Sequence, residues 1–515
     1  MMKNYGLLVY RYKKQINMGN WDIMVNIGFL IGTGSIGEDS LKINQIFKNI
    51  SNHNFYVASR IDEKIHLNGI LEDYIGETAF NDIQKNIGNL RNHVQKFYVV
   101  YESPYLKKQY NDTDIIKLQK WIGISFDFLS SMDRRFFDRR NINDTRDNSD
   151  LNNYIAGLIN FFKDFFLKNN IDIFINTIED DVFSLAAYFV AKKLGITIIG
   201  FMPGRFPING NMFCKNFNSI CQWNELKTIE WSRIKSLYHD NTIAQKDLQD
   251  RNRKLLRVNL YSIIKDIKMY FNYKRYCNYI FEVYPYEKFI FGKISPWTEI
   301  KKSLKKIIRY KLFRFIVSEH NIKEDDYYLF PIHFVDDAQI TFREPLMDQV
   351  EIIKKITRAL PSGYKLYVKP HPHYLGTDIS LSDFYKLSKL KNLKIMNPSL
   401  PPIKLIKNSK GVITFNSTTG FEALIHDVPV ITLGHDFYCK DELCFVVRDI
   451  NDLPSKLLES QIRKKDRDKI KEFIEKVYLN TIWVDRLGYT YDKCGLMKED
   501  GEKIASSLNE ILDNE

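Results

Sequence analysis

The stretch GVITFNSTTGFEALIHDVPVITLG, residues 411–434, decides the fold. Its first apolar run predicts a buried strand that ends at Phe415, and a helix begins near Gly420. A second apolar run, VPVITLG, predicts another strand directly after the helix. Short loops that join a strand, a helix and a strand imply parallel pairing of the two strands. The stretch therefore predicts an α/β domain built on a parallel sheet.

The same alternation recurs along the chain, on both sides of a helical and basic region. Apolar runs predict strands at 21–32, 54–62 and 96–103 in the first third of the chain. The alternation of strands and helices resumes after residue 327. We predict an α/β chain with two Rossmann-like domains facing a cleft and a helical insertion. The predicted parts are an N-terminal domain at 1–221, a basic helical insertion at 222–322, a C-terminal Rossmann-like domain at 323–451 and a helical segment at 452–515.

Composition favours a cytoplasmic protein. The hydrophobic fraction is 44%, and no apolar run reaches the roughly 20 residues of a membrane-spanning helix. The first 20 residues have too short an apolar core for a signal peptide. The six cysteines form no C-x-x-C pair, which favours a reducing compartment.

The net charge of +12 is concentrated in one region. Residues 251–320 hold 17 Lys and Arg against 5 Asp and Glu, a surplus of 12. Within it, IKKSLKKIIRYKLFRFIV (300–317) alternates basic and apolar residues at roughly helical spacing. Such a helix either lies on an anionic membrane surface or presents a solvated face. No recognition motif accompanies the charge, so we expect no nucleic-acid partner.

Hydroxyl groups cluster where the helix of the deciding stretch begins. Asn416, Ser417, Thr418 and Thr419 precede Gly420, which lets the backbone come close to a ligand. Amide groups and the dipole at a helix N-terminus favour phosphate. An ordinary N-cap is the alternative, but a cap needs one such residue rather than four. Glu422, in the first turns, either accepts hydrogen bonds from a ribose or favours the helix dipole.

The stretch LYVKPHPHYLG (366–376) places a second set of donors after a strand of the same domain. Lys369 and His371 can neutralise a phosphate, and the flanking prolines hold the turn rigid. A metal site would need a further ligand at a fixed spacing. His333, His426 and His435 show no such spacing, so we expect an anion rather than a metal.

Two further loops carry candidate groups. Asp336 and Asp337 follow the strand at 327–334, with His333 before them, and suit a general base or nucleophile, or a capped turn. Gly34 lies in a G-x-G-x-x-G pattern, with Asp62 beyond it, which fits a dinucleotide fingerprint or a tight turn. Arg205, in the loop FMPGRFPINGN, is expected to face the cleft.

Three stretches, FPIHFVDDAQITFREPLMDQ, LYVKPHP and NSTTGFEALIHDVPVITLG, occur in this order. They resemble the bacterial capsule polysaccharide biosynthesis family, which includes Kdo transferases of capsule and lipopolysaccharide assembly. The resemblance covers about residues 327–450. It implies a GT-B-like fold, with 1–221 on the acceptor side and 323–451 binding the nucleotide sugar, and a CMP-sugar donor.

The resemblance also implies residue roles. His371-Pro372 matches the family's His-Pro motif, whose histidine contacts the donor phosphate. Ser417-Thr418 matches its paired-hydroxyl motif, with threonine in place of one serine, and Asp337 stands where many relatives carry glutamate. The expected catalytic residues are Asp337, His371 and Asp336, and the expected donor-binding residues are Lys369, His371, Asn416, Ser417, Thr418, Thr419 and Glu422.

These patterns predict a glycosyltransferase of surface polysaccharide synthesis, without a cofactor. It would transfer an acidic, Kdo-like or sialic-acid-like sugar from a CMP-sugar to a glycan or lipid-linked acceptor, at the inner face of the membrane. The alternatives are a UDP-sugar transferase or teichoic-acid-type glycerophosphotransferase on the same fold, an NAD(P)-dependent oxidoreductase that uses the glycine pattern, and a non-enzymatic membrane-surface assembly protein.

Overall fold

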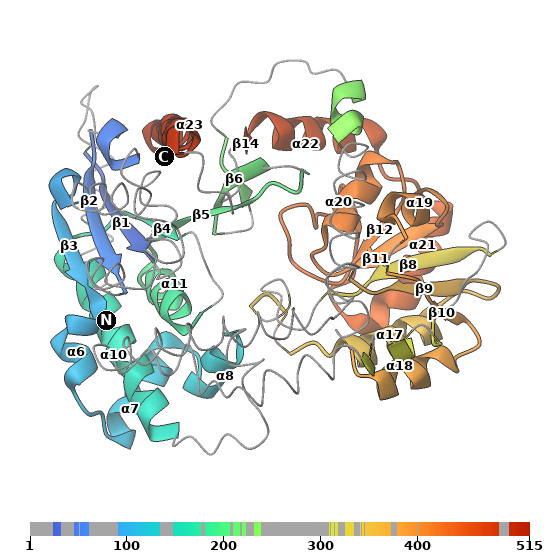
Figure 1. The fold of residues 1–515 in the computed structure, drawn as a ribbon, viewed down its shortest axis with the longest axis horizontal. Helices are drawn as coiled ribbons and strands as arrows, with labels where there is room; N and C mark the ends of the chain where they lie inside the picture. The colour runs from blue at the N-terminus through green and yellow to red at the C-terminus, as the bar shows by residue number, and fades with distance from the viewer. Residues whose placement is uncertain are drawn as a thin grey trace, which may run out of the picture.

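The structure, a computed structural model, contains two α/β units, drawn at the left and right of Figure 1. Each is built on its own β-sheet. The structure describes residues 24–31, 46–50, 52–60, 91–133, 148–176, 181–206, 210–216, 219–222, 231–237, 308–309, 311–313, 315–317, 325–333, 340, 342–344, 346–371, 379–398, 400–483 and 494–514.

The N-terminal sheet has the strand order β14-β6-β5-β4-β1-β2-β3 among the described residues, with β7 paired to β6. Strands β1 to β5 pair in parallel, and β6 runs antiparallel to β5. Strands β1 and β4 are buried along nearly their whole length, as parallel strands covered on both faces are. The strands are β1 (Asn26–Ile31), β2 (Asn54–Ser59), β3 (Lys96–Val99), β4 (Ile173–Asn176), β5 (Thr197–Pro203), β6 (Gly210–Lys215), β7 (Ser219–Ile220) and β14 (Ile482–Trp483).

Helices of this unit begin at side-chain caps. Asp181 caps α11 (Val182–Leu194) by accepting from the Ser184 amide at 2.6 Å, and Gly195 ends it in the left-handed region at φ +69°. The long helix α10 (Asn148–Lys168) packs against α11. Other helices are η1 (Arg91–His93), η2 (Val100–Glu102), α6 (Pro104–Lys107), α7 (Asp112–Ile122), α8 (Phe126–Ser131) and α23 (Cys494–Asn514).

The C-terminal sheet is parallel throughout and has the order β10-β9-β8-β11-β12-β13. Numbered along the chain, this is the doubly wound order 3-2-1-4-5-6, and the order reverses between β8 and β11. Ligands of such sheets bind in the crevice at this switch point, outside the carboxyl ends of the strands. The strands are β8 (Tyr327–Pro331), β9 (Lys365–Lys369), β10 (Leu393–Ile395), β11 (Gly411–Thr414), β12 (Val430–Thr432) and β13 (Phe445–Val446).

Alternate side chains of this sheet enter two different cores. Tyr327 and Leu329 pack on the face covered by α19 and α20, whereas Tyr328 and Phe330 pack on the face covered by α17, α18 and α21. This follows from the period of two along a strand. The helices of this unit are α17 (Gln349–Ala359), α18 (Leu381–Ser388), α19 (Pro402–Lys407), α20 (Thr418–Ile425), η3 (Ile450–Asp452), α21 (Leu453–Ile462) and α22 (Arg467–Leu479).

The C-terminal segment returns to the N-terminal sheet. After α22, which packs on α20, the short strand β14 pairs antiparallel with β6. Helix α23 then contacts β14 and reaches β2, where the His53 ring lies 3.9 Å from the Asp513 carboxylate. In Figure 1, α23 accordingly lies beside the strands of the N-terminal unit. A segment predicted as helical thus also supplies an edge strand.

The predicted fold class is confirmed, because both units are α/β and their sheets are mainly parallel. The domain boundaries stay predictions, and most of the predicted basic insertion lies outside the described residues. Within the parts of the chain that the structure describes, every helix is too short or too polar to cross a membrane.

Candidate functional site

The hydroxyl cluster lies where β11 leads into α20, at the switch point of the C-terminal sheet. Ser417 is the N-cap, and its Oγ accepts a hydrogen bond from the Thr419 amide at 3.2 Å. Asn416 and Thr419 are buried, Ser417 is half-buried and Thr418 is exposed. One of the four polar residues therefore satisfies the cap, and Thr418 is exposed at the positive end of the helix dipole.

The loop after β12 closes over this helix start. The Tyr438 hydroxyl donates to the Ser417 carbonyl at 2.6 Å. Two glycines permit the close approach: a Cβ at Gly434 would collide with the Asn416 side-chain oxygen, and one at Gly420 would lie 2.7 Å from the Tyr438 hydroxyl oxygen. Burial holds the pKa of Tyr438 well above its ordinary value, so the phenol stays a donor.

Lys369 and Glu422 form the electrostatic centre of the site. Lys369, the last residue of β9, is 4% exposed, and its Nζ donates to the Pro398 carbonyl at 3.3 Å. Glu422 of α20 is 7% exposed. Burial raises the pKa of Glu422 to about 7, and the Lys369 charge opposes this rise. The structure therefore brings these two predicted residues together, with Glu422 more buried than a surface ribose acceptor would be.

The two predicted histidines lie at the ends of neighbouring strands. His333 follows β8 and is buried, with its ring 6.5 Å from the Phe415 ring. Its backbone is clamped by Gln349, which accepts from the His333 amide at 2.9 Å and donates to its carbonyl at 2.8 Å. His371 follows β9 and is half-buried. Both therefore stand at the carboxyl edge that carries Ser417.

Arg205, which we expected to face a cleft, binds a carboxylate of the C-terminal unit. Its Nη2 lies 2.5 Å from Asp436 Oδ2, and both residues are buried. Arg343 Nη1 lies 3.6 Å from the other Asp436 oxygen and donates to the His435 carbonyl at 2.6 Å. Asp436 is thus held by one guanidinium from each unit of the protein.

Several predicted residues lie outside the described part of the chain. They are Asp336 and Asp337, Gly34 with the rest of its glycine pattern, Asp62, Pro372 and His373. Their roles stay predictions.

Sequence reasoning missed the residues that support the hydroxyl cluster from a distance. Tyr438, Asp436, Arg343 and Gln349 each touch the site through tertiary contacts. One signal was available, because HDFYC (435–439) follows a predicted strand of the same sheet and must therefore emerge at the same edge.

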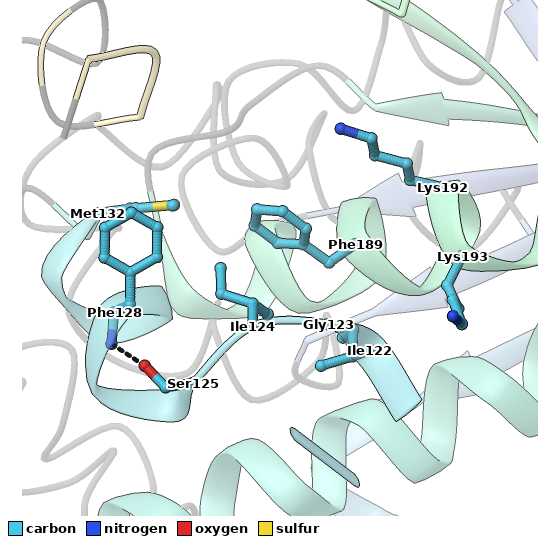
Figure 2. A pocket seen from close by; sticks show the side chains of 9 residues that line it. All are labelled: Ile122, Gly123, Ile124, Ser125, Phe128, Met132, Phe189, Lys192 and Lys193. Carbon is cyan, nitrogen blue, oxygen red and sulfur yellow. Dashed lines mark hydrogen bonds between the residues drawn. The ribbon is translucent and has the colours of Figure 1, made fainter. Parts of the chain in front are cut away.

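A separate pocket of about 650 Å³ lies in the N-terminal unit, and Figure 2 shows its lining. It is formed by the connection between α7 and α8 and by one face of α11, and it includes none of the predicted site residues. Its walls are mostly apolar, with two lysines at the end of α11. The lining residues are Ile122, Gly123, Ile124, Ser125, Phe128, Met132, Phe189, Lys192 and Lys193.

The crevice of the C-terminal sheet offers groups that suit an anion. Lys369 supplies a buried cation, and the start of α20 supplies the exposed residue Thr418 and the positive end of the helix dipole. Among the residues that the structure describes, no three His, Cys, Asp or Glu side chains come together as a metal site would require.

This fold and crevice define a class: two-unit α/β proteins with a doubly wound C-terminal sheet and polar groups at its switch point. Residues 231–444 match the model of the family described as capsule polysaccharide biosynthesis protein, a match that covers less than half of the chain. The chain is 28% identical over 159 residues to the capsule polysaccharide export protein KpsS of Escherichia coli. That match covers 28% of this chain and 40% of the relative, so the chain matches less than half of that relative's length.

Two solved structures show a loose likeness. One is KpsC of Thermosulfurimonas dismutans, a beta Kdo 2,4 transferase, with 14% identity, coverage of 61% of this chain and 82% of that chain, and a TM-score of 0.29. The other is the UDP-GlcNAc 2-epimerase of Methanocaldococcus jannaschii, with 15% identity, coverage of 93% and 98%, and a TM-score of 0.26. At these TM-scores neither structure informs the site of this chain.

Proposed function

We propose that the chain is a glycosyltransferase of surface polysaccharide synthesis that uses a CMP-activated acidic sugar. The match of residues 231–444 to the model of capsule polysaccharide biosynthesis proteins supports a role in making capsule polysaccharide. The likeness to the KpsC structure is too low to support a transferase activity. We therefore infer this activity from the site of this chain. The acceptor is a glycan or a lipid-linked glycan.

One observation carries the proposal: a buried lysine and the start of α20 stand at the carboxyl edge of one doubly wound sheet. Lys369 ends β9, Ser417 caps α20 after β11, and His371 follows Lys369. A phosphate at the switch point would receive charge from one side and amide and hydroxyl hydrogen bonds from the other. We assign donor binding to Lys369, His371, Asn416, Ser417, Thr418 and Thr419.

The reaction needs stabilisation of a leaving phosphate. The bond between the anomeric carbon and the phosphate oxygen breaks, and its electron pair leaves with CMP. An acceptor hydroxyl oxygen forms the new bond to that carbon and gives its proton to a base, for which Asp337 or Asp336 is proposed. Lys369 and the start of α20 lower the barrier by holding the phosphate charge as it develops.

We place the acceptor on the N-terminal unit. The pocket beside α11 combines apolar walls with Lys192 and Lys193, which suits an anionic acceptor with an apolar part (Figure 2). The basic region at 251–320 would hold the enzyme at an anionic membrane surface. Liposomes with anionic lipids should therefore bind the protein more tightly than neutral ones, and equal binding to both would remove the membrane role.

A nucleotide panel distinguishes the donor classes. A ligand that binds the folded protein raises its unfolding temperature, and a tighter ligand raises it more. We therefore expect CMP to raise the unfolding temperature of the full chain more than UDP, CDP-glycerol or NAD(P)H does. Stabilisation by UDP alone would favour a UDP-sugar transferase. Stabilisation by CDP-glycerol above CMP would favour a glycerophosphotransferase, and by NAD(P)H alone an oxidoreductase.

Variants in the loops after β9 and β11 test the phosphate role. His371→Ala and Ser417→Ala should each lower turnover roughly ten- to a hundredfold, because each removes a hydrogen bond to a charged group. The double variant should lose less than the product of the two effects, because both groups act on one phosphate. Ser409→Ala is the matched control, since its Oγ donates to the Ile406 carbonyl at 2.8 Å just before β11 begins. Full activity of His371→Ala, or reversible loss of turnover on adding EDTA alone, would contradict the role.

A further inference from the structure

The turn between β5 and β6 extends from the N-terminal sheet to the C-terminal unit. Arg205, in this turn, makes the buried 2.5 Å contact with Asp436 described above. Its backbone has φ +64°, in the left-handed region that residues with a Cβ rarely adopt. A long charged side chain at such a position points to a role for the side chain rather than for the turn.

Phe206, the next residue, packs on the same part of the C-terminal unit. Its ring lies edge-on to Phe421 of α20 at 5.5 Å and to Tyr478 of α22 at 5.5 Å. Phe421 precedes Glu422 and follows the hydroxyl cluster by two residues. Two consecutive residues of one turn therefore contact both α20 and the loop that closes over its start.

The contact continues from Asp436 to the helix start. Asp436 Oδ1 accepts from the Phe437 amide at 2.9 Å, and its carbonyl accepts from the Cys439 amide at 2.9 Å. These bonds fix the backbone on both sides of Tyr438, whose hydroxyl donates to the Ser417 carbonyl at 2.6 Å. Arg205 thus connects to the proposed phosphate site through its ion pair with Asp436, the backbone from Asp436 to Tyr438, and the Tyr438 hydrogen bond to Ser417.

We propose that Arg205 is a positioning residue for the donor site, acting on Ser417 through Asp436 and Tyr438. The inference rests on the proposed function in one respect, namely that the start of α20 binds the donor phosphate. Arg343 alone would still neutralise Asp436, but it comes from the C-terminal unit. Arg205 comes from the N-terminal unit, where the acceptor is proposed to bind, and so makes the geometry of the donor site depend on that unit.

Binding measurements on the full chain test this role. Arg205→Met and Tyr438→Phe should each weaken CMP binding roughly tenfold at temperatures well below unfolding, and the double variant should lose no more than about the larger single effect. Arg205→Lys should retain part of the affinity, because it keeps a cation opposite Asp436. Arg205→Gly relieves the backbone but removes the guanidinium, so it should resemble Arg205→Met. The matched control is Arg448→Met, which breaks an exposed Arg–Asp pair with Asp441 and should bind CMP as the wild type does.

Hydrogen exchange gives a second readout that needs no nucleotide. Arg205→Met should speed exchange of the amides at 417–420 relative to the wild type and to Arg448→Met. If the wild type binds no nucleotide, the proposed function fails, and faster exchange at 417–420 would still support the positioning role. Unchanged exchange there, or unchanged CMP affinity with only a lower unfolding temperature, would show that Arg205 merely holds the units together and would overturn the inference.

Discussion

The protonation of Glu422 reports on the charge in the crevice of the C-terminal sheet. Its carboxyl group is buried, and this burial raises its pKa to about 7, against an ordinary value of 4.5. The charge of Lys369 moderates the rise but does not cancel it. Near neutral pH the site therefore holds a cation and a carboxyl group that is only partly ionised, which leaves positive charge for a phosphate.

The raised pKa predicts a pH dependence of stability. The pKa of Glu422 is higher in the folded state than in the unfolded state. Its contribution to the free energy of unfolding is therefore fully present below about pH 4.5 and is lost as pH rises through about 7. The change amounts to roughly 3 kcal/mol. Glu422→Gln should remove this fall. We expect the difference in unfolding free energy between variant and wild type, measured by urea denaturation, to grow in favour of the variant from pH 4.5 to 7.

His426 also titrates, so the variant must be compared with the wild type at each pH. Burial lowers its pKa to about 4, so its contribution is present above about pH 6.5 and is lost as pH falls through 4, opposite in sign to that of Glu422. Since His426 is present in both proteins, it cancels in the difference. Parallel pH curves for wild type and Glu422→Gln would contradict the assigned titration.

At the residue scale the sequence predicted the polar groups but not their supports. Lys369 and Ser417 were found because one ends and the other follows an apolar strand, and strand ends of one parallel sheet share an edge. Asp436 and Tyr438 were missed because their roles depend on a tertiary contact with Arg205 and on the carbonyl of Ser417. Neither contact leaves a periodic pattern in the sequence.

At the element scale, α20 shows how packing overrides helix propensity. Alanine in place of Gly420 would normally stabilise a helix by about 1 kcal/mol. Here the new Cβ would lie 2.7 Å from the Tyr438 hydroxyl oxygen and 2.8 Å from Thr414 Cγ2. Gly420→Ala should therefore lower the unfolding free energy by about 1–3 kcal/mol, as overpacking does.

Urea denaturation checks this prediction. Thr418→Ala is the control, because Thr418 is exposed on the same turn and its replacement gains helix propensity without a collision. We expect the control to be as stable as the wild type or slightly more stable. A Gly420→Ala variant that is more stable than the wild type would mean that Tyr438 moves aside at no cost.

Element prediction succeeded for long apolar runs and failed for short strands. The runs at 54–62 and 327–334 contain β2 and β8. Strand β14, with two residues, lies in a segment predicted as helical, and its pairing with β6 is decided by the position of α22 and α23. Two residues are too few to show the period of a strand.

At the scale of the whole molecule, α23 stabilises a sheet far away in sequence. Its apolar residues Leu508, Ile511 and Leu512 are buried, and Asp513 reaches His53 beside β2. Leu508→Ser should therefore speed hydrogen exchange in β1 and β2 as well as in α23 itself. Lys503→Ser, at an exposed position of the same helix, should leave both strands unchanged. Faster exchange confined to α23 would contradict the packing.

The fold class was predictable because the sequence shows two series of alternating strand and helix patterns, separated by a stretch without strand-like alternation. The dependence of one unit on the other was not, since the turn at Arg205 reads as a glycine and proline loop and its partner lies 231 residues away. Long-range ion pairs of this kind are set by the folded geometry alone.

The central claim is that the crevice of the C-terminal sheet holds the phosphate of a CMP-activated acidic sugar during transfer. The most direct measurement is release of CMP, followed by mass spectrometry, when the full chain is incubated with CMP-Kdo, CMP-sialic acid and a set of UDP-sugars. We predict CMP release from an acidic-sugar donor by the wild type and by Ser409→Ala, reduced roughly ten- to a hundredfold in Ser417→Ala. Consumption of a UDP-sugar with no release of CMP from either acidic donor would contradict the claim.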